Sequence, residues 1–211
     1  MKITWFGHAC FSIESDGKRI VTDPFDADVG YPVVPREADL VTISHEHWDH
    51  NAVQVFNNEP RVIRGNGEFS ESNIKIQGFP SFHDKQEGIE RGTNTIYKIT
   101  TEGIDLLHLG DLGHVLGQGQ VQQIGKVDVL LVPVGGTFTI DAEEACQMVE
   151  LLKPRIIIPM HYGTPVLSFS LLPLEAFTIH YDKVTKKDNL EINCEGLPEK
   201  TELIVLDYLS C

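Results

Sequence analysis

Three histidines and one aspartate stand within six residues of each other, at His45, His47, Asp49 and His50. Imidazole nitrogens and carboxylate oxygens are ligands that Zn²⁺ and similar cations prefer. Residues two apart in an extended or turning segment project to the same side, so His45 and His47 can bind one ion. Asp49 and His50 follow, where the chain can direct them to a second ion. The pattern H-x-H-x-D-H therefore predicts a metal site, with a solvated histidine-rich turn as the other interpretation.

The element that must position this cluster is the apolar run Leu40–Ile43, which has the length and the β-branched content of a buried strand. Several other runs of strand character are followed, directly or after a few residues, by a histidine or an aspartate. They are residues 2–6 before Gly7-His8, residues 19–22 before Asp23, residues 73–77 before His83, residues 104–109 before Asp111 and residues 155–158 before His161.

This combination resembles a known family. The sequence His45-x-His47-x-Asp49-His50 after a buried strand is similar to the signature of the metallo-β-lactamase superfamily. Within it, the chain most resembles the small stand-alone hydrolases related to ascorbate-6-phosphate lactonase, and the likeness extends from Gly7-His8 to His161. The resemblance implies an αββα sandwich, whereas the pattern of strands and helices alone predicts only an α/β or α+β fold.

The resemblance also implies a set of ligands, carried over position by position. The first ion would be bound by His45, His47 and His83, and the second by Asp49, His50 and His161. Asp111, flanked by glycines, would bridge the two ions. Asp23 would orient the metal-binding loop, although an aspartate before a proline is also an ordinary turn opener.

Two such ions would make the site a hydrolytic one. We expect zinc, with manganese or iron as alternatives, because histidine and carboxylate ligands accept all three. A water between two divalent ions loses a proton near neutral pH and becomes a nucleophile that Asp49 and Asp111 would orient. The two ions, the two carboxylates and the hydroxide together keep about one positive charge, which favours an anionic substrate.

Further polar residues are candidates for substrate contacts. Arg91 follows His83 in a polar loop, so it can bind an anion, or it can be a solvated arginine. His8 can lie beside the pocket, or it can be a histidine bonded only to backbone groups. His108 is expected in the core because strand alternation separates it from Asp111. His114 can reach the pocket, but nothing in the pattern fixes it there.

Other segments have a clearer structural than chemical meaning. Residues 51–58 are expected to be a short helical stretch, and Asp141 with Glu144 predicts a capping box at the start of a helix that ends before Pro154. Two further strands are expected at residues 190–193 and 203–206. Residues 164–177 are too apolar for an exposed loop, so they either wall the active site, cover an interface in a homo-oligomer or pack on their own core.

Composition limits the remaining possibilities. The 211 residues form one predicted domain, 1–211, and the formal charge of −14 argues against nucleic-acid binding. No secretory signal or membrane-length apolar run is visible, which predicts a cytoplasmic protein that does not enter a membrane. The cysteines show no C-x-x-C spacing, so neither a zinc knot nor a disulfide framework is expected; they are Cys10, Cys146, Cys194 and Cys211.

We therefore expect a metal-dependent hydrolase that cleaves a small anionic ester, lactone or phosphodiester. Two other functions fit the same residues. One is an iron enzyme of the same fold that handles sulfur or oxygen, and the other is a family member that binds metal without turnover. Metal content and a panel of substrates distinguish the three, because fold alone does not determine chemistry.

Overall fold

The computed structural model describes residues 1–33 and 35–210, so Cys211 lies outside the described part of the chain. Its first sheet begins with an alternating sequence, Lys2 to Phe6, that turns Ile3 and Trp5 inward. A hairpin follows, in which Asp16 and Gly17 adopt the positive φ angles, 51° and 70°, that a tight two-residue turn requires. The sheet has the order β13 (Asn189–Glu191), β1 (Lys2–Gly7), β2 (Cys10–Ser15), β3 (Lys18–Thr22), β4 (Leu40–Ile43) and β5 (Arg61–Arg64).

The second sheet combines an antiparallel half with a parallel half. Its parallel strands β10 and β11 are buried at every position, as their continuous apolar sequences predict. The order is β12 (Val184–Lys187), β14 (Glu202–Leu206), β11 (Ile156–Met160), β10 (Val129–Pro133), β9 (Ile104–His108), β8 (Thr93–Thr101), β7 (Ile74–Phe82) and β6 (Gly67–Glu71).

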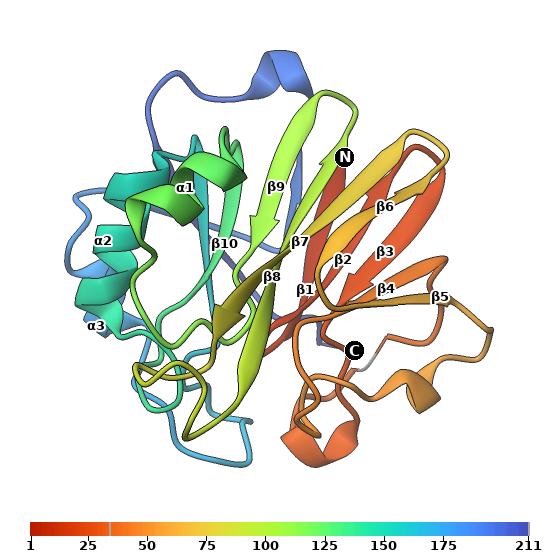
Figure 1. Cartoon of the computed structure of the whole chain (residues 1–211), viewed down its shortest axis with the longest axis horizontal. Helices are drawn as coiled ribbons and strands as arrows, with labels where there is room; N and C mark the ends of the chain where they lie inside the picture. The colour runs from red at the N-terminus through yellow and green to blue at the C-terminus, as the bar shows by residue number, and fades with distance from the viewer. Residues whose placement is uncertain (34, 211) are drawn as a thin grey trace.

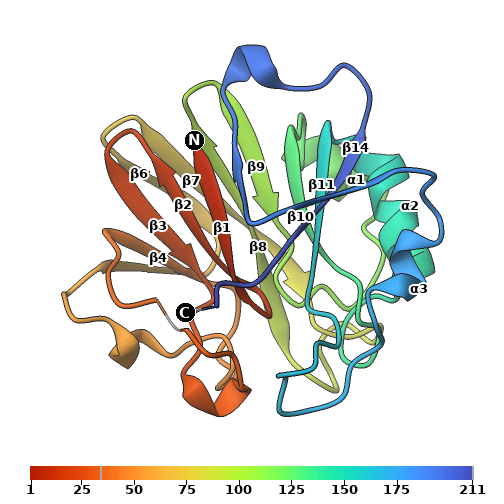
Figure 2. The same ribbon diagram turned by 180° about the vertical axis from the view of Figure 1, so that it is seen from behind.

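The two sheets pack face to face, and the helices α1 (Gln118–Ile124), α2 (Ala142–Leu152) and α3 (Glu175–Thr178) cover the outer side of the second sheet (Figures 1 and 2). Helix α2 begins with the expected capping box, since the Asp141 carboxylate accepts a bond from the Glu144 amide and the Glu144 carboxylate accepts one from the Asp141 amide. The two packed sheets with helices outside them confirm the expected α/β sandwich.

The first sheet is covered on its outer side mainly by loops. Because neighbouring strand residues face opposite ways, Ile20 and Leu40 join the core between the sheets while Val21 and Val41 join a smaller apolar cluster behind. Short 3₁₀ turns belong to this cover, η1 (Ala27–Val29) and η2 (Val53–Val55). The helical stretch expected over residues 51–58 is reduced to η2. A third turn, η3 (Cys194–Gly196), precedes β14.

The apolar segment 164–177 packs largely on its own chain. Val166, Leu167 and Phe169 contact the smaller apolar cluster behind the first sheet, and Phe177 is fully buried in the main core. Packing on the protomer's own core, one of the three expectations for this segment, thus accounts for much of it. Among the described residues, no helix is both long enough and apolar enough to cross a bilayer.

Candidate metal centre

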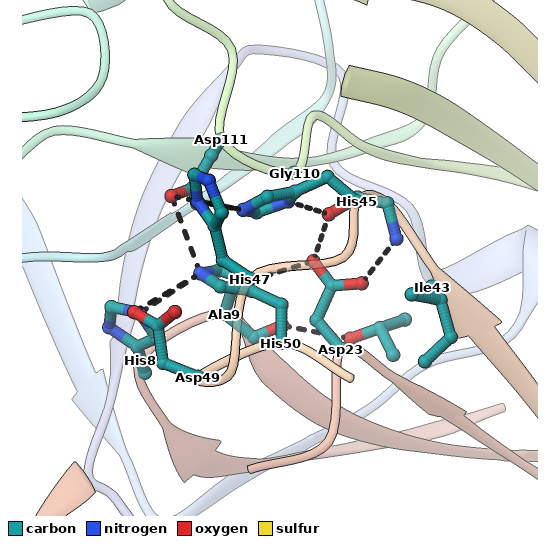
Figure 3. Close-up of polar contacts among 12 residues, drawn as sticks. His8, Ala9, Asp23, Ile43, His45, His47, Asp49, His50, Gly110 and Asp111 are labelled. Carbon is teal, nitrogen blue, oxygen red and sulfur yellow. Dashed lines mark hydrogen bonds and ion pairs between the residues drawn. The ribbon is translucent and has the colours of Figure 1, made fainter. Parts of the chain in front are cut away.

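The residues that could bind metal meet because their strands all end at one edge of the sandwich. In the first sheet β1, β3 and β4 run in the same direction, so their carboxyl ends bring together the turns that hold His8, Asp23 and His45. In the second sheet β7, β9 and β11 likewise share a direction. Their ends carry His83, Asp111 and His161 to the same place, since Oδ2 of Asp111 lies 3.3 Å from Nε2 of His83 and 3.1 Å from Nε2 of His161. Figure 3 shows Asp111 there beside His45, His47 and His50.

The histidines form two groups. The ring nitrogens of His45, His47 and His83 lie within 4.8 Å of one another, and so do those of a second group, which are His8, His50 and His161. The Nε2 atom of His45 is 3.1 Å from Nδ1 of His47, and the Nε2 atoms of His8 and His50 are also 3.1 Å apart. Each group therefore converges on a space of about the size of a single ion.

Asp111 lies between the two groups. Its Oδ2 atom is 3.3 Å from Nε2 of His83 in the first group, and 3.3 Å and 3.1 Å from those of His50 and His161 in the second. Burial would raise the pKa of this carboxyl, but His161 and His50 hold the pKa well below its usual range. Its Oδ1 atom is buried without a hydrogen-bond partner among the described residues.

A tight backbone arrangement delivers Asp111. Gly110 has a φ of 56°, and a Cβ atom there would stand 2.4 Å from Oδ1 of Asn94 and 2.6 Å from Cβ of Ser44. The amide of Asp111 donates to the same Asn94 oxygen, at 3.0 Å. Asn94 in turn donates to the Leu109 carbonyl. Asn94 is a supporting residue that was not predicted from the sequence. The one feature that could have indicated its role is that strands disfavour asparagine, yet Asn94 stands in a run predicted to be a strand.

Asp23 holds the loop of residues 44–50, which contains the predicted ligands, through hydrogen bonds to Ser44 and His50. Its carboxylate accepts bonds from the Ser44 amide at 2.7 Å, from the Ser44 hydroxyl at 2.5 Å and from Nδ1 of His50 at 3.1 Å. Nδ1 of His45 lies 2.9 Å from the same hydroxyl, so it donates there. Both imidazoles thus carry a proton on Nδ1 and direct Nε2 into the cluster. Burial alone would lower the pKa of His50, but Asp111 and Asp23 raise it well above its usual value, so without metal its Nε2 also carries a proton, which a bound ion would displace.

His8, a member of the second group, is fully buried. Its Nε2 atom lies 3.1 Å from Oδ2 of Asp49 and the same distance from Nε2 of His50. Burial, and next the neighbouring His161, lower the pKa of His8 to about 4, so the ring is neutral at pH 7. Its backbone has a φ of 53°, and its carbonyl accepts bonds from Trp5 and His161.

The remaining candidates lie outside the cluster. Arg91 lines a cavity together with His83 but does not contact the histidine groups. His108 is buried as expected, donating to the Ala9 carbonyl and accepting from the Gly110 amide. His114 donates to the Val115 carbonyl and makes no contact with the predicted ligands.

Comparison with known proteins assigns the chain to a family. The sequence matches the family described as the beta-lactamase superfamily domain over residues 2–161. A UPF0173 metal-dependent hydrolase of Carboxydothermus hydrogenoformans is 32% identical, with 80% of this chain and 88% of the relative covered. A second one, from Methanopyrus kandleri, is 29% identical, with 78% and 85% covered.

Solved structures agree with the sequence comparison. A protein of Thermotoga maritima, named as a candidate Zn-dependent hydrolase of the metallo-β-lactamase superfamily, is 43% identical with a TM-score of 0.82 and 97% of both chains covered. Igni18, a metallo hydrolase of Ignicoccus hospitalis, is 26% identical with a TM-score of 0.62, covering 80% of this chain and 86% of its own. The chain belongs to the metallo-β-lactamase superfamily. It is a metal-dependent hydrolase whose histidine and aspartate side chains can bind metal.

Proposed function

We propose that this protein is a dinuclear hydrolase, with zinc as its first choice of metal, that cleaves a small anionic ester, lactone or phosphodiester. The observation that carries the proposal is the position of Asp111. One carboxylate oxygen lies within 3.3 Å of imidazole nitrogens from both histidine groups, which is the place of a bridge between two ions. The proposed ligands are His45, His47 and His83 for the first ion, and Asp49, His50 and His161 for the second.

The donor atoms fit such ions. Two nitrogens bound to one tetrahedral zinc at about 2.0–2.1 Å would be about 3.3 Å apart. In the first group, Nε2 of His45 and Nδ1 of His47 are 3.1 Å apart, and among the proposed ligands of the second ion, Oδ2 of Asp49 lies 3.7 Å from Nε2 of His50. Burial, and next the charge of His50, lower the pKa of His45 to about 3, so its ring keeps the free lone pair that metal binding requires. The unpartnered Oδ1 of Asp111 adds a buried acceptor that a cation would satisfy.

The chain's own residues have separate tasks in the reaction. Bound ions supply a hydroxide near neutral pH and polarise the oxygen of the scissile group. Asp111 and Asp49 would accept a hydrogen bond from the attacking hydroxide and so orient it. Asp23, through Ser44 and His50, fixes which nitrogen of each imidazole is free. Arg91, in the cavity that His83 also lines, can bind an anionic part of the substrate.

Metal analysis of the purified protein tests the whole proposal. We expect two equivalents of transition metal in the wild-type protein. His47→Ala should lose the first ion and His161→Ala the second, because each removes a ligand of only one group. Elemental analysis of the three proteins, together with turnover on esters, lactones and phosphodiesters, measures this. A wild-type protein that binds no stoichiometric metal from metal-supplemented buffer would disprove the proposal, and iron with a coloured protein would favour the iron enzyme.

His8 provides an independent prediction about the second ion. In the proposed site its Nε2–H group donates to Asp49 and holds that ligand in place. His8→Ala should weaken the second ion by about 10- to 100-fold, the usual effect of losing such a support, and leave the first unchanged. His8→Gln keeps an N–H donor at a similar reach and should restore part of the affinity.

Cobalt titration followed by absorption measures the two affinities separately. His114→Gln is the control, because His114 makes no contact with the predicted ligands. Identical cobalt titrations of His8→Ala and the wild-type protein would remove His8 from the site.

A further inference from the structure

We propose that the site recognises a substrate with a flat apolar group and, apart from the scissile group, a second anionic group. This inference rests on the proposed hydrolase function and names its substrate class. The apolar group would lie on an aromatic rim, defined as Trp48, Phe138 and Phe169, and the anion would bind Arg91. None of these residues belongs to the proposed ligand set.

The aromatic rim is assembled from three separate loops. Trp48 lies in the histidine loop after β4, Phe138 follows β10 and Phe169 follows β11. The Phe169 ring centroid is 6.3 Å from that of Trp48 and 6.3 Å from that of Phe138, both edge to face. Loops from both sheets thus contribute to one continuous aromatic surface.

This surface borders the metal centre. Phe169 contacts the His8 ring edge to face, with 5.5 Å between the ring centroids. Trp48 stands in sequence between the proposed ligands His47 and Asp49. Phe138 lines a cavity of about 260 Å³ that His83 also lines. The middle ring of the rim, Phe169, therefore contacts the second histidine group, and Phe138 shares a cavity with His83 of the first.

The rim is open to a ligand. Trp48 is 52% exposed and Phe138 39% exposed, and both are among the largest exposed apolar side chains of the chain. Aromatic rings left exposed beside polar catalytic groups are typical of ligand sites, where a second apolar surface covers them. Trp5, by contrast, is 1% exposed and packs in the core.

Arg91 supplies the second feature of the rim. Its guanidinium lies over the Phe138 ring, 5.4 Å from the centroid, a contact that holds the group in place and leaves its donors accessible. The carboxylate nearest to it is Glu90 at 3.7 Å, beyond hydrogen-bond length, and the arginine side chain remains 36% exposed. Within the described chain, the guanidinium makes no hydrogen bond, so its planar array of donors can bind a carboxylate or a phosphate.

Most other charges of the cavity are already paired. Asp84 accepts four backbone N–H bonds from residues 86 to 91. Glu144 forms an ion pair with Lys85 at 2.6 Å, and Asp141 accepts from the Glu144 amide as the helix cap. Glu90, which also lines the cavity, lies 3.7 Å from Arg91 and accepts a hydrogen bond from Gln86, so the guanidinium of Arg91 keeps its donors free for a ligand at the end of the aromatic rim.

Non-hydrolysable phosphonates test the proposal without turnover. Benzylphosphonate, 3-phosphonopropionate and ethylphosphonate carry the same phosphonate, with an aromatic ring, a carboxylate or neither. They would be titrated into the zinc-loaded protein by calorimetry and by Trp48 fluorescence. Burying one ring predicts about tenfold tighter binding of benzylphosphonate than of ethylphosphonate. A charge contact at a partly exposed arginine predicts about fivefold for 3-phosphonopropionate.

Variants assign each preference to its residue. Phe169→Ala should abolish the preference for the ring, whereas Phe69→Ala on the distant strand β6 should keep it. Arg91→Gln should abolish the preference for the carboxylate, whereas Lys85→Gln, whose ammonium is already paired, should keep it. Trp48→Phe should keep the ring preference and lose the fluorescence change, since the buried Trp5 then remains as the reporter.

Three results would overturn the proposal. They are equal affinities of the three phosphonates, a ring preference that persists in Phe169→Ala, and a carboxylate preference that persists in Arg91→Gln. The proposed hydrolase function fails in a different way, namely by the absence of ester, lactone and phosphodiester cleavage in a metal-loaded protein. Selective phosphonate binding without any turnover would therefore support the rim and disprove the hydrolytic role.

Discussion

Replacing Asp111 by alanine should reduce kcat/KM more than the loss of either His47 or His161 does. The reduction should exceed about 100-fold, because the loss of a residue that only supports a metal ligand already costs up to that much. The reason is its position. The Oδ2 atom contacts His83 in one histidine group and both His50 and His161 in the other. Its removal would disturb both ions and the hydroxide that we propose between them, whereas each histidine serves one ion.

Asp111→Asn separates charge from shape. The amide has nearly the same volume, but it lacks the negative charge that would be shared by two cations, so we expect a similarly large loss of turnover and metal. Asp128 is the matched control, because it too is fully buried and lies just before β10, at the other end of the parallel strands. Its Oδ2 atom accepts from the Asp105 amide and from Lys126, so Asp128→Asn should cost stability and leave metal content intact.

Elemental analysis and steady-state kinetics of the two asparagine variants decide the point. Near-normal turnover and metal content in both Asp111 variants would show that this carboxylate is not a bridge. Equal losses of metal in the Asp111 and Asp128 variants would indicate a general effect of removing a buried charge.

Sequence patterns predicted the elements whose burial is uniform. The runs that became β4, β10 and β11 are mostly apolar, contain many β-branched residues and are buried at every position, because both faces of each strand are covered. Strand β6 and helix α1 were not predicted. Residues 67–71 are mostly exposed and carry little apolar signal. Helix α1 buries one residue, Ile124, and has glycines at both ends, so no apolar stripe marks it.

The candidate site divides in a similar way. Its histidines and aspartates could be named because they stand at the ends of strand-like runs, and chain direction then brings those ends together. The supporting roles of Ser44 and Asn94 were not predicted from the sequence. A short polar side chain has no pattern of its own, and its role depends on neighbours that are distant in sequence. The same holds for the aromatic rim, whose rings come from three loops.

Asp23→Ala should lower both stability and metal affinity. The carboxylate is fully buried and accepts bonds from the Ser44 amide, the Ser44 hydroxyl and His50. Its loss leaves these buried donors without an acceptor, which costs about 3–5 kcal/mol of the free energy of unfolding. For a chain of this size that corresponds to a melting temperature lower by about 10 °C. The freed imidazoles can also rotate, so metal binding should weaken by about 10- to 100-fold.

Asp23→Asn distinguishes support of the metal from support of the fold. The side-chain oxygen of the new asparagine can still accept from the Ser44 amide. The new NH₂ group, however, takes the place of Oδ2, which in the wild-type protein accepts from both the Ser44 hydroxyl and Nδ1 of His50. We expect most of the stability to return while metal affinity stays low, because His50 is then driven toward the tautomer with its proton on Nε2. Thermal denaturation of the metal-free protein and metal titration measure the two effects separately.

The exposed Asp39 is the control for removing an aspartate next to a strand of the same sheet. It accepts from the Arg19 amide and from Lys18, but both groups can bond to water when it is gone. Asp39→Ala should therefore change stability by no more than about 1 kcal/mol and leave metal binding unchanged. If Asp23→Asn bound metal as tightly as the wild-type protein, the carboxylate would be a structural anchor of the loop alone, and the orientation of His50 would have to come from the ions themselves.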